Sequence, residues 1–435
     1  MIYLIVSIFG LFFVKGRYSI SRYWFFLLLI SSVCAFVVGR QHQTDVQTLI
    51  YVIYNVVLLY FLFYSYKDFS NLKGVESDGI NFRKLHTLER IFGVLCFMAI
   101  IVNTYILYKV LNMLSSDIFT VQEFKNEGGA GEVYDSLVPH VLISFSNFVT
   151  PIGYLFIGLH FYYLITKDIK RSICFLFLST VIILNGLMAL SRSVTVQYIL
   201  VYVCMLFFVF PLLSNHARSK IIRIGIVVGV IIGFVFFVIS SSRFSEFYYK
   251  RSKNEAMIDE TTNPLLFSTL DYFSLWQENA PLLMDKYEFG HIYWGMFNSC
   301  GLAVQIEGRL GSGLTQKKAA REREFQKIMG DESNSFHGPI ARLVHDFGWS
   351  GTILFILIMG VLIRKIQPTN GTAHFKTFFF LPLLLPFASS FFAGNVYGNL
   401  AIDLAVIYQL FIYQQIKKSS TKKIKYTQTQ MQIST

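Results

Sequence analysis

The sequence predicts an all-α polytopic membrane protein, and three observations lead to this fold class. Of its 435 residues, 54% are hydrophobic and 15% are charged, whereas soluble domains carry about 25% charged residues. Apolar runs of roughly 20 residues, the length that crosses a bilayer, recur along the chain. The basic residues gather in alternate connections between these runs, which is the pattern of a multi-pass protein.

Taken in order, the apolar runs predict eleven membrane spans. They lie at residues 1–14, 23–39, 47–66, 91–111, 139–165, 173–190, 194–212, 221–241, 348–364, 376–394 and 398–415. The first begins "MIYLIVSIFG", without a basic n-region or a small-residue cleavage site, so we expect a retained helix rather than a cleaved signal peptide. The five cysteines form no CxxC pair, and buried lone cysteines are usually small apolar packing residues.

The connections predict the orientation. The segment after the last span, residues 416–435, contains "KKSSTKKIK" and is expected in the cytoplasm, which places the N-terminus outside. The connections on the predicted cytoplasmic side carry Lys15, Arg17, Arg22, Lys67, Lys73, Arg83, Lys84, Arg90, Lys167, Lys170, Arg171, Arg218, Lys220, Arg223, Arg364, Lys365 and Lys376. Before residue 242 the outer connections hold little beyond Arg40, Lys109, Lys125 and Arg192.

This topology divides the chain into four parts. Residues 1–241 form eight spans with short connections, apart from an acidic, glycine-rich outer connection at 112–138 that we expect to be mobile. Residues 242–347 form a large polar block, predicted to be an external loop. Residues 348–415 form three further spans, and residues 416–435 are the basic cytoplasmic tail.

The familiar motifs of soluble enzymes are missing from the sequence. It contains no GxxxxGK[ST], GxSxG or HExxH, so ATP-driven and zinc-hydrolase chemistry lack their usual signature. Asp-x-Asp, which would hold a metal ion against a phosphate, is also absent. We therefore predict no metal and no cofactor, and any phosphate must be bound by arginine and lysine.

Two arginine-bearing stretches lie at the predicted outer surface. Arg192 lies in "LMALSRSVTVQYIL", between two spans, where its planar guanidinium can bind phosphate oxygens through two hydrogen bonds. Arg243 and Arg251 lie in "SSSRFSEFYYKRSK", directly after the eighth span. The alternative is that Arg192 is an interfacial anchor and that the aromatic residues of the second stretch belong to an aromatic belt.

A third candidate stretch, "SFHGPIARLVHDFGWSG" (335–351), leads into the ninth span. Pro339 suits the first position of a helix with Gly338 before it, and Gly348 suits a stop or tight turn. The spacing therefore predicts a short helix between the two glycines.

Four side chains of this stretch are candidates for chemistry. Arg342 and Asp346 are four residues apart and would face one another on a helix, with His345 beside them. His337 precedes the helix, where the helix dipole favours a neutral imidazole that could accept a proton from a hydroxyl. The alternative is an exposed Arg342–Asp346 ion pair with interfacial histidines. Together with the arginines above, these residues place cations at one membrane surface, which favours a lipid-linked anionic substrate.

The pattern resembles the bacterial O-antigen polymerase (Wzy-type, oligosaccharide repeat unit polymerase) family and, more distantly, the O-antigen ligases. The matching residues are Ser191–Arg192 in "LSRS" and "DFGWSG" (346–351), which opens the span after the large loop. His337 lies nine residues before Asp346, where ligase-like relatives often have a histidine, although this chain has "FHGP" where a His–Asn pair is common.

The resemblance implies a GT-C-like glycosyltransferase of the bacterial inner membrane. Its implied reaction joins undecaprenyl-diphosphate-linked oligosaccharide repeat units en bloc at the outer face, without a metal. Arg192, Arg243, Arg251, Arg342 and His345 would bind diphosphate or sugar, and His337 and Asp346, with Arg192, would act in catalysis. The implied partners are membrane lipids, a chain-length regulator and a flippase, but not nucleic acid. An O-antigen ligase and a lipid-linked oligosaccharide flippase or transporter remain the alternatives.

Overall fold

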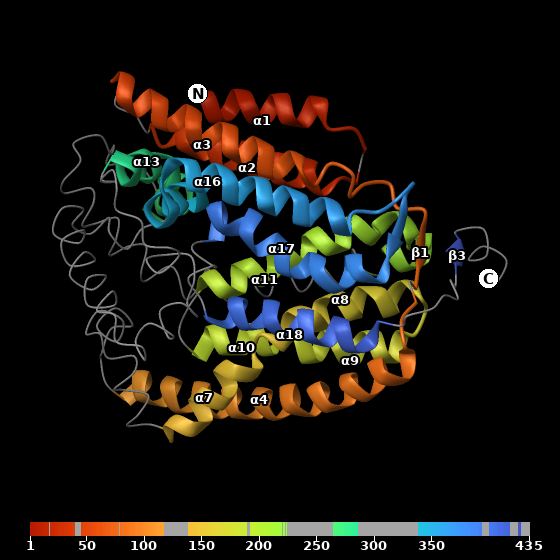
Figure 1. Ribbon diagram of the computed structural model, residues 1–435. Helices are drawn as coiled ribbons and strands as arrows, with labels where there is room; N and C mark the ends of the chain where they lie inside the picture. Colours follow the sequence, from red (N-terminus) through yellow and green to blue (C-terminus); the bar gives the residue numbers. More distant parts are fainter. Residues whose placement is uncertain are drawn as a thin grey trace.

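The computed structural model shows a bundle of long helices that run side by side along one direction (Figure 1). It describes residues 1–16, 18–39, 45–77, 79–116, 138–188, 192–219, 221, 223, 264–285, 338–393, 400–417 and 425–427. The helices are α1 (Ile2–Phe13), α2 (Ile20–Val37), α3 (Val46–Tyr64), α4 (Phe82–Ser116), α7 (His140–Val149), α8 (Ile152–Ile165), α9 (Ile169–Ser179), α10 (Val181–Met188), α11 (Arg192–Val209), the 3-10 turn η1 (Phe210–Leu212), α13 (Pro264–Asp285), α16 (Gly338–Ile366), α17 (Phe375–Ala393) and α18 (Leu400–Ile416).

Helices occupy ten of the eleven predicted spans, and 221–241 lies almost wholly outside the described residues. Seven stretches of the described chain are long and apolar enough to cross a membrane. They are Ile20–Val37, Val46–Tyr64, Phe82–Asn112, Val141–Ile165, Ile169–Met188, Val194–Leu212 and Gly338–Ile366. The chain is therefore a mostly helical, multi-pass membrane protein, as the composition predicts.

Three short strands mark one end of the bundle. β1 (Gly74–Glu76) pairs in parallel with β2 (Thr372–His374) and antiparallel with β3 (Lys425–Thr427). These strands follow α3, α16 and α18 along the chain, so the three helices direct their C-terminal ends to the same place. We call it the sheet end, on the right of Figure 1.

Helix α13 lies at the opposite end, which we call the α13 end (left in Figure 1). Its first residue is Pro264, and the N–H that proline lacks would have no partner at this position of a helix anyway. It falls inside the block predicted as an external loop, yet it packs against α2, α3 and α16. Trp276 and Met284 are each 1% exposed. The block thus contributes a helix to the bundle.

Breaks in the helices have identifiable causes. Pro151 separates α7 from α8, and Gly348 interrupts α16 with φ 70° and ψ −179°, a backbone conformation that is essentially confined to glycine. In α17, Pro382 has no N–H to donate to the Phe378 carbonyl. Gly158 of α8 approaches that carbonyl oxygen so closely that any Cβ would overlap it, so α8 and α17 pack backbone to backbone.

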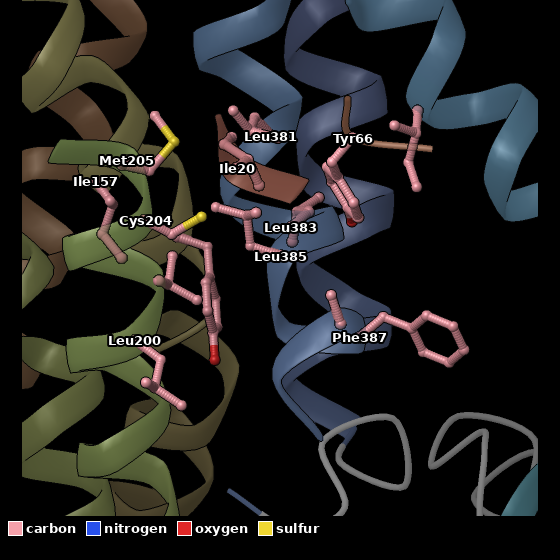
Figure 2. Close-up of a cluster of buried hydrophobic side chains, with 14 of the residues drawn as sticks. Ile20, Tyr66, Ile157, Leu200, Cys204, Met205, Leu381, Leu383, Leu385 and Phe387 are labelled. Atoms are coloured by element: carbon pink, nitrogen blue, oxygen red, sulfur yellow. The ribbon is translucent and has the colours of Figure 1, made fainter. Parts of the chain in front are cut away.

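Part of the apolar interior lies between α11 and α17 (Figure 2). Cys204 and Met205 of α11 and Leu381 and Leu385 of α17 are all fully buried there. Cys204 thus acts as a small apolar packing residue, as expected for a lone cysteine in an apolar run. The contact fixes the position of α17, whose C-terminal half leads back to the α13 end.

Candidate functional site at the α13 end

The first part of α16 is a short helix of its own, bounded by two glycines. Gly338 has φ of +72°, and helical backbone follows from Pro339. A Cβ on Gly338 would lie 3.2 Å from the ring of Trp276 in α13, so glycine serves both the backbone conformation and the close contact. The kink at Gly348 ends the helix. The boundaries that the glycine spacing predicts are confirmed.

This short helix buries the carboxylate that the sequence singled out. Asp346 is fully buried, and its charge acts on the half-buried guanidinium of Arg342, one turn earlier. An ion pair exposed to solvent, the alternative interpretation, is therefore wrong for Asp346. The reason is that α13 packs against this part of α16, which the sequence could not show. Burying a carboxylate beside an arginine is costly, and such an arrangement marks a candidate functional site.

His345 joins α16 to α13. Its Nε2 lies 2.7 Å from the backbone carbonyl oxygen of Leu283, and its side chain is buried. A carbonyl only accepts hydrogen bonds, so Nε2 carries the proton and donates it. This nitrogen is committed to the fold, so His345 positions the helix that carries Arg342 and Asp346. The family resemblance had implied that His345 binds substrate.

A buried hydrogen-bond network joins α13 to α2. The Ser31 hydroxyl donates to the Phe273 carbonyl oxygen at 2.8 Å. The Ser31 hydroxyl oxygen in turn accepts from the Trp276 indole N–H at 2.9 Å and from the Gln277 amide at 3.0 Å. One hydroxyl thus uses its donor and both acceptor sites. The network holds α13 against α2, at the end of the bundle where α13 also packs against α16.

The C-terminal end of α13 meets α3 and the second part of α16. The Gln47 amide donates to the Asp285 carboxylate at 2.9 Å. Tyr51 stacks on Trp349, with ring centroids 5.5 Å apart, and the Tyr54 hydroxyl donates to the Trp349 carbonyl oxygen at 2.6 Å. These contacts fix the residues that follow the Gly348 kink, and so the direction in which α16 enters the membrane.

Arg192 lies towards the same end. It begins α11, and Gln197, five residues later, has its amide 3.4 Å from the hydroxyl of Ser389 in α17. Since α17 starts beside β2 at the sheet end, Ser389 lies towards the α13 end. Arg192 therefore begins its helix at the end that carries Arg342 and Asp346. Arg243, Arg251 and His337, the remaining candidates, lie outside the described residues.

A second polar cluster, at the sheet end, was missed by the sequence analysis. Glu89 of α4 is 8% exposed and accepts a 2.6 Å hydrogen bond from the Tyr163 hydroxyl of α8. The Arg171 guanidinium lies 5.4 Å from the centre of the Tyr163 ring, and its Nε lies 3.2 Å from an Asp168 oxygen. Glu89 lies two residues before the predicted span 91–111, so hydropathy assigned it to a connection.

The signal for Glu89 was helical spacing. The predicted span began at residue 91, but α4 begins at Phe82, where polar residues still alternate with apolar ones. Leu85, Glu89 and Cys96 recur at intervals of four and seven residues, and all three are buried. Following that stripe backwards from the span would have found the acid.

The chain matches no family model, no curated protein and no solved structure. The function proposed for it therefore rests on its own residues and their arrangement.

Proposed function

We propose that the chain is a membrane glycosyltransferase that joins undecaprenyl-diphosphate-linked oligosaccharide repeat units into a bacterial surface polysaccharide. The observation that carries the proposal is the buried Asp346 beside Arg342, on a short helix held at one end of a membrane bundle. Arg192 begins its helix at the same end. A base and cations at one membrane surface suit a reaction whose leaving group is a lipid diphosphate.

In the proposed reaction, a hydroxyl of the acceptor unit attacks the anomeric carbon of the donor glycan. The new C–O bond forms as the bond from that carbon to the diphosphate oxygen breaks, and undecaprenyl diphosphate leaves with the bonding electrons. His337 accepts the proton of the hydroxyl, and the buried Asp346 orients Arg342. Arg342 and Arg192 stabilise the negative charge that develops on the departing oxygen. Arg243 and Arg251 would add further contacts to the diphosphate.

The distribution of basic residues supports an orientation with the α13 end outside. The connections and helix ends at the sheet end carry Lys67, Lys73, Arg364, Lys365, Lys376 and Lys417. Cytoplasmic connections are enriched in such residues. We therefore propose eleven spans in a GT-C-like architecture in the bacterial inner membrane, with the N-terminus outside and the C-terminus in the cytoplasm. A flippase would deliver the substrate to the outer face, and a chain-length regulator would limit the product.

The test uses arginine variants in a strain that lacks its own copy, with glycan length read as a ladder on a gel. Arg342→Ala and Arg192→Ala should each reduce polymerisation about 100-fold or more, because each removes a group that stabilises the leaving diphosphate. Lysine at either position should restore little, since it cannot form two parallel hydrogen bonds.

The matched control is Arg364→Ala, an arginine of the same helix α16 at the sheet end, which should leave the ladder unchanged. Wild-type ladders from both Arg342→Ala and Arg192→Ala, at equal protein levels, would refute the proposal.

A lipid-linked oligosaccharide transporter is the second candidate, and Glu89 is the observation that favours it. Ionisable residues within spans often mark ion or substrate pathways. Purified protein separates the two functions: a polymerase lengthens a lipid-linked repeat unit in detergent, and a transporter leaves it unchanged. Attachment separates a ligase, because loss of a polymerase leaves single units attached to the lipid core and loss of a ligase leaves none.

A further inference from the structure

A groove runs between α3 and the second part of α16. Its volume is about 490 Å³, and it is lined by residues of α3 from Ile50 to Phe61 and by Ile353, Ile356 and Leu357 of α16. The one polar side chain in its lining is Tyr54, whose hydroxyl donates to the Trp349 carbonyl oxygen. The groove therefore offers its occupant an apolar wall.

The groove opens on the surface that faces the membrane. Ile53 and Leu357, on opposite walls, are 46% and 58% exposed, and both helices are candidate spans. Its α3 wall, from Ile50 to Phe61, rises about 16 Å along the helix axis. A long hydrocarbon chain has the shape and polarity to lie in it, and water does not.

The same helix joins the groove to the candidate site. α16 carries the groove wall after the Gly348 kink and Arg342 and Asp346 before it. Trp349 follows the kink directly, and its carbonyl oxygen accepts a hydrogen bond from Tyr54 of the α3 wall, whose lining residue nearest the α13 end is Ile50. A lipid whose chain lay in the groove would thus bring its head group to the end that holds Arg342.

We propose that this groove binds the polyprenyl tail of the diphosphate-linked substrate, an inference that rests on the proposed function and names its lipid subsite. Any membrane lipid chain can pass through such a groove. A polyprenyl diphosphate is retained there because its anionic head meets the cationic Arg342 while its tail fills the apolar wall. These two contacts, one on each side of the Gly348 kink, favour a lipid with a diphosphate head group over lipids with a single negative charge.

The experiment measures binding of undecaprenyl diphosphate to the purified full-length protein in detergent, by native mass spectrometry. Ile53→Trp and Leu357→Trp fill the groove from its two walls. Each should weaken binding about 10-fold or more, as expected when the tail is excluded from its apolar contact. Leu354→Trp is the matched control: it adds the same ring to α16 at an exposed position outside the groove, and it should leave the Kd unchanged.

Phosphatidylglycerol in excess should fail to displace the probe from the wild type. Displacement at equal concentration would show that the groove takes bulk lipid, and undiminished binding by both folded tryptophan variants would show that the tail lies elsewhere. Either result overturns the inference. A melting temperature within a few degrees of the wild type identifies the folded variants, and if one fails this check the variant on the opposite wall decides.

Polymerisation by the same preparations keeps the two proposals apart. If the tryptophan variants weaken binding while the wild type lengthens no glycan, the groove stands and the polymerase function falls. If the wild type polymerises while both variants keep wild-type affinity, the function stands and the groove falls.

Discussion

Two buried hydrogen-bond networks, one around Ser31 at the α13 end and one around Glu89 at the sheet end, are built differently. At the α13 end, one serine hydroxyl gathers neutral partners from a helix more than 240 residues away in sequence. At the sheet end, Glu89, Tyr163 and Arg171 join charged and neutral groups of α4, α8 and α9. Burying neutral hydrogen-bonded groups costs little free energy. A buried charge destabilises the fold strongly when any one of its partners is removed.

The two networks differ because the helices that they join differ in polarity. Helix α13 carries Asp271, Gln277 and Asn279, all buried, so it cannot be stabilised by apolar contact alone. Its polar groups need partners inside the bundle, and Ser31 of α2 supplies the one for the Gln277 amide. At the sheet end the helices are already packed by their apolar faces, and the charged cluster is added where they leave the membrane.

The largest effect is expected from Glu89→Ala at the sheet end. It removes the acceptor of the Tyr163 hydroxyl and the charge opposite Arg171, which should cost about 2–3 kcal/mol of unfolding free energy. The measurement is thermal unfolding of purified protein in detergent. Glu89→Gln keeps an oxygen that accepts from Tyr163 and should lose much less. Equal melting temperatures for the two variants would show that the hydrogen bond does not stabilise this end.

A smaller effect is expected at the α13 end from Ser31→Ala. The change leaves the Trp276 N–H without its acceptor in a buried site and should cost about 1–2 kcal/mol in the same assay. Ser7→Ala is the matched control, because the buried Ser7 hydroxyl donates within its own helix, α1, to the Tyr3 carbonyl oxygen at 2.6 Å. If the control is as damaging as Ser31→Ala, the network does not hold α13.

At the α13 end, the sequence predicted the features that depend on local backbone geometry and not those that depend on packing between distant helices. Apolar length predicted the spans, and glycine and proline predicted the short helix from Gly338 to the Gly348 kink, because those residues act through local backbone geometry. The burial of Asp346 could not be predicted, since it depends on α13 lying over it. Helix α13 itself was hidden because its polar residues find their partners on α2, far away in sequence.

At the sheet end the reason is the opposite one. Glu89 was overlooked although its partners lie on α8 and α9, which are neighbours of α4 in the bundle. A hydropathy window ends a span at the first charged residues, whereas a helix continues for as long as its buried face finds partners. Span edges set by hydropathy therefore exclude the ionisable residues that matter at the membrane surface.

The smallest effect concerns an exposed charge at the α13 end, Asp45, which caps α3. Hydrogen bonds from the Thr48 hydroxyl and from the Thr48 backbone N–H hold the pKa of the Asp45 carboxyl below its usual range. A lowered folded-state pKa stabilises the protein above the unfolded pKa of about 3.9, and this stability is lost as the pH falls through the folded value. Asp45→Asn keeps an oxygen acceptor and removes the titration.

Melting temperatures between pH 3 and 6 should therefore fall slightly less steeply with acid in Asp45→Asn than in the wild type. Glu89→Gln should leave the slope of the melting temperature below pH 4 as it is in the wild type, because this variant keeps the Asp45 cap. Parallel curves for wild type and Asp45→Asn would mean that the cap does not depend on charge. In that case an exposed carboxylate would stabilise its helix no better than a neutral amide does. Of the two carboxylates compared, only the buried Glu89 would then contribute to stability.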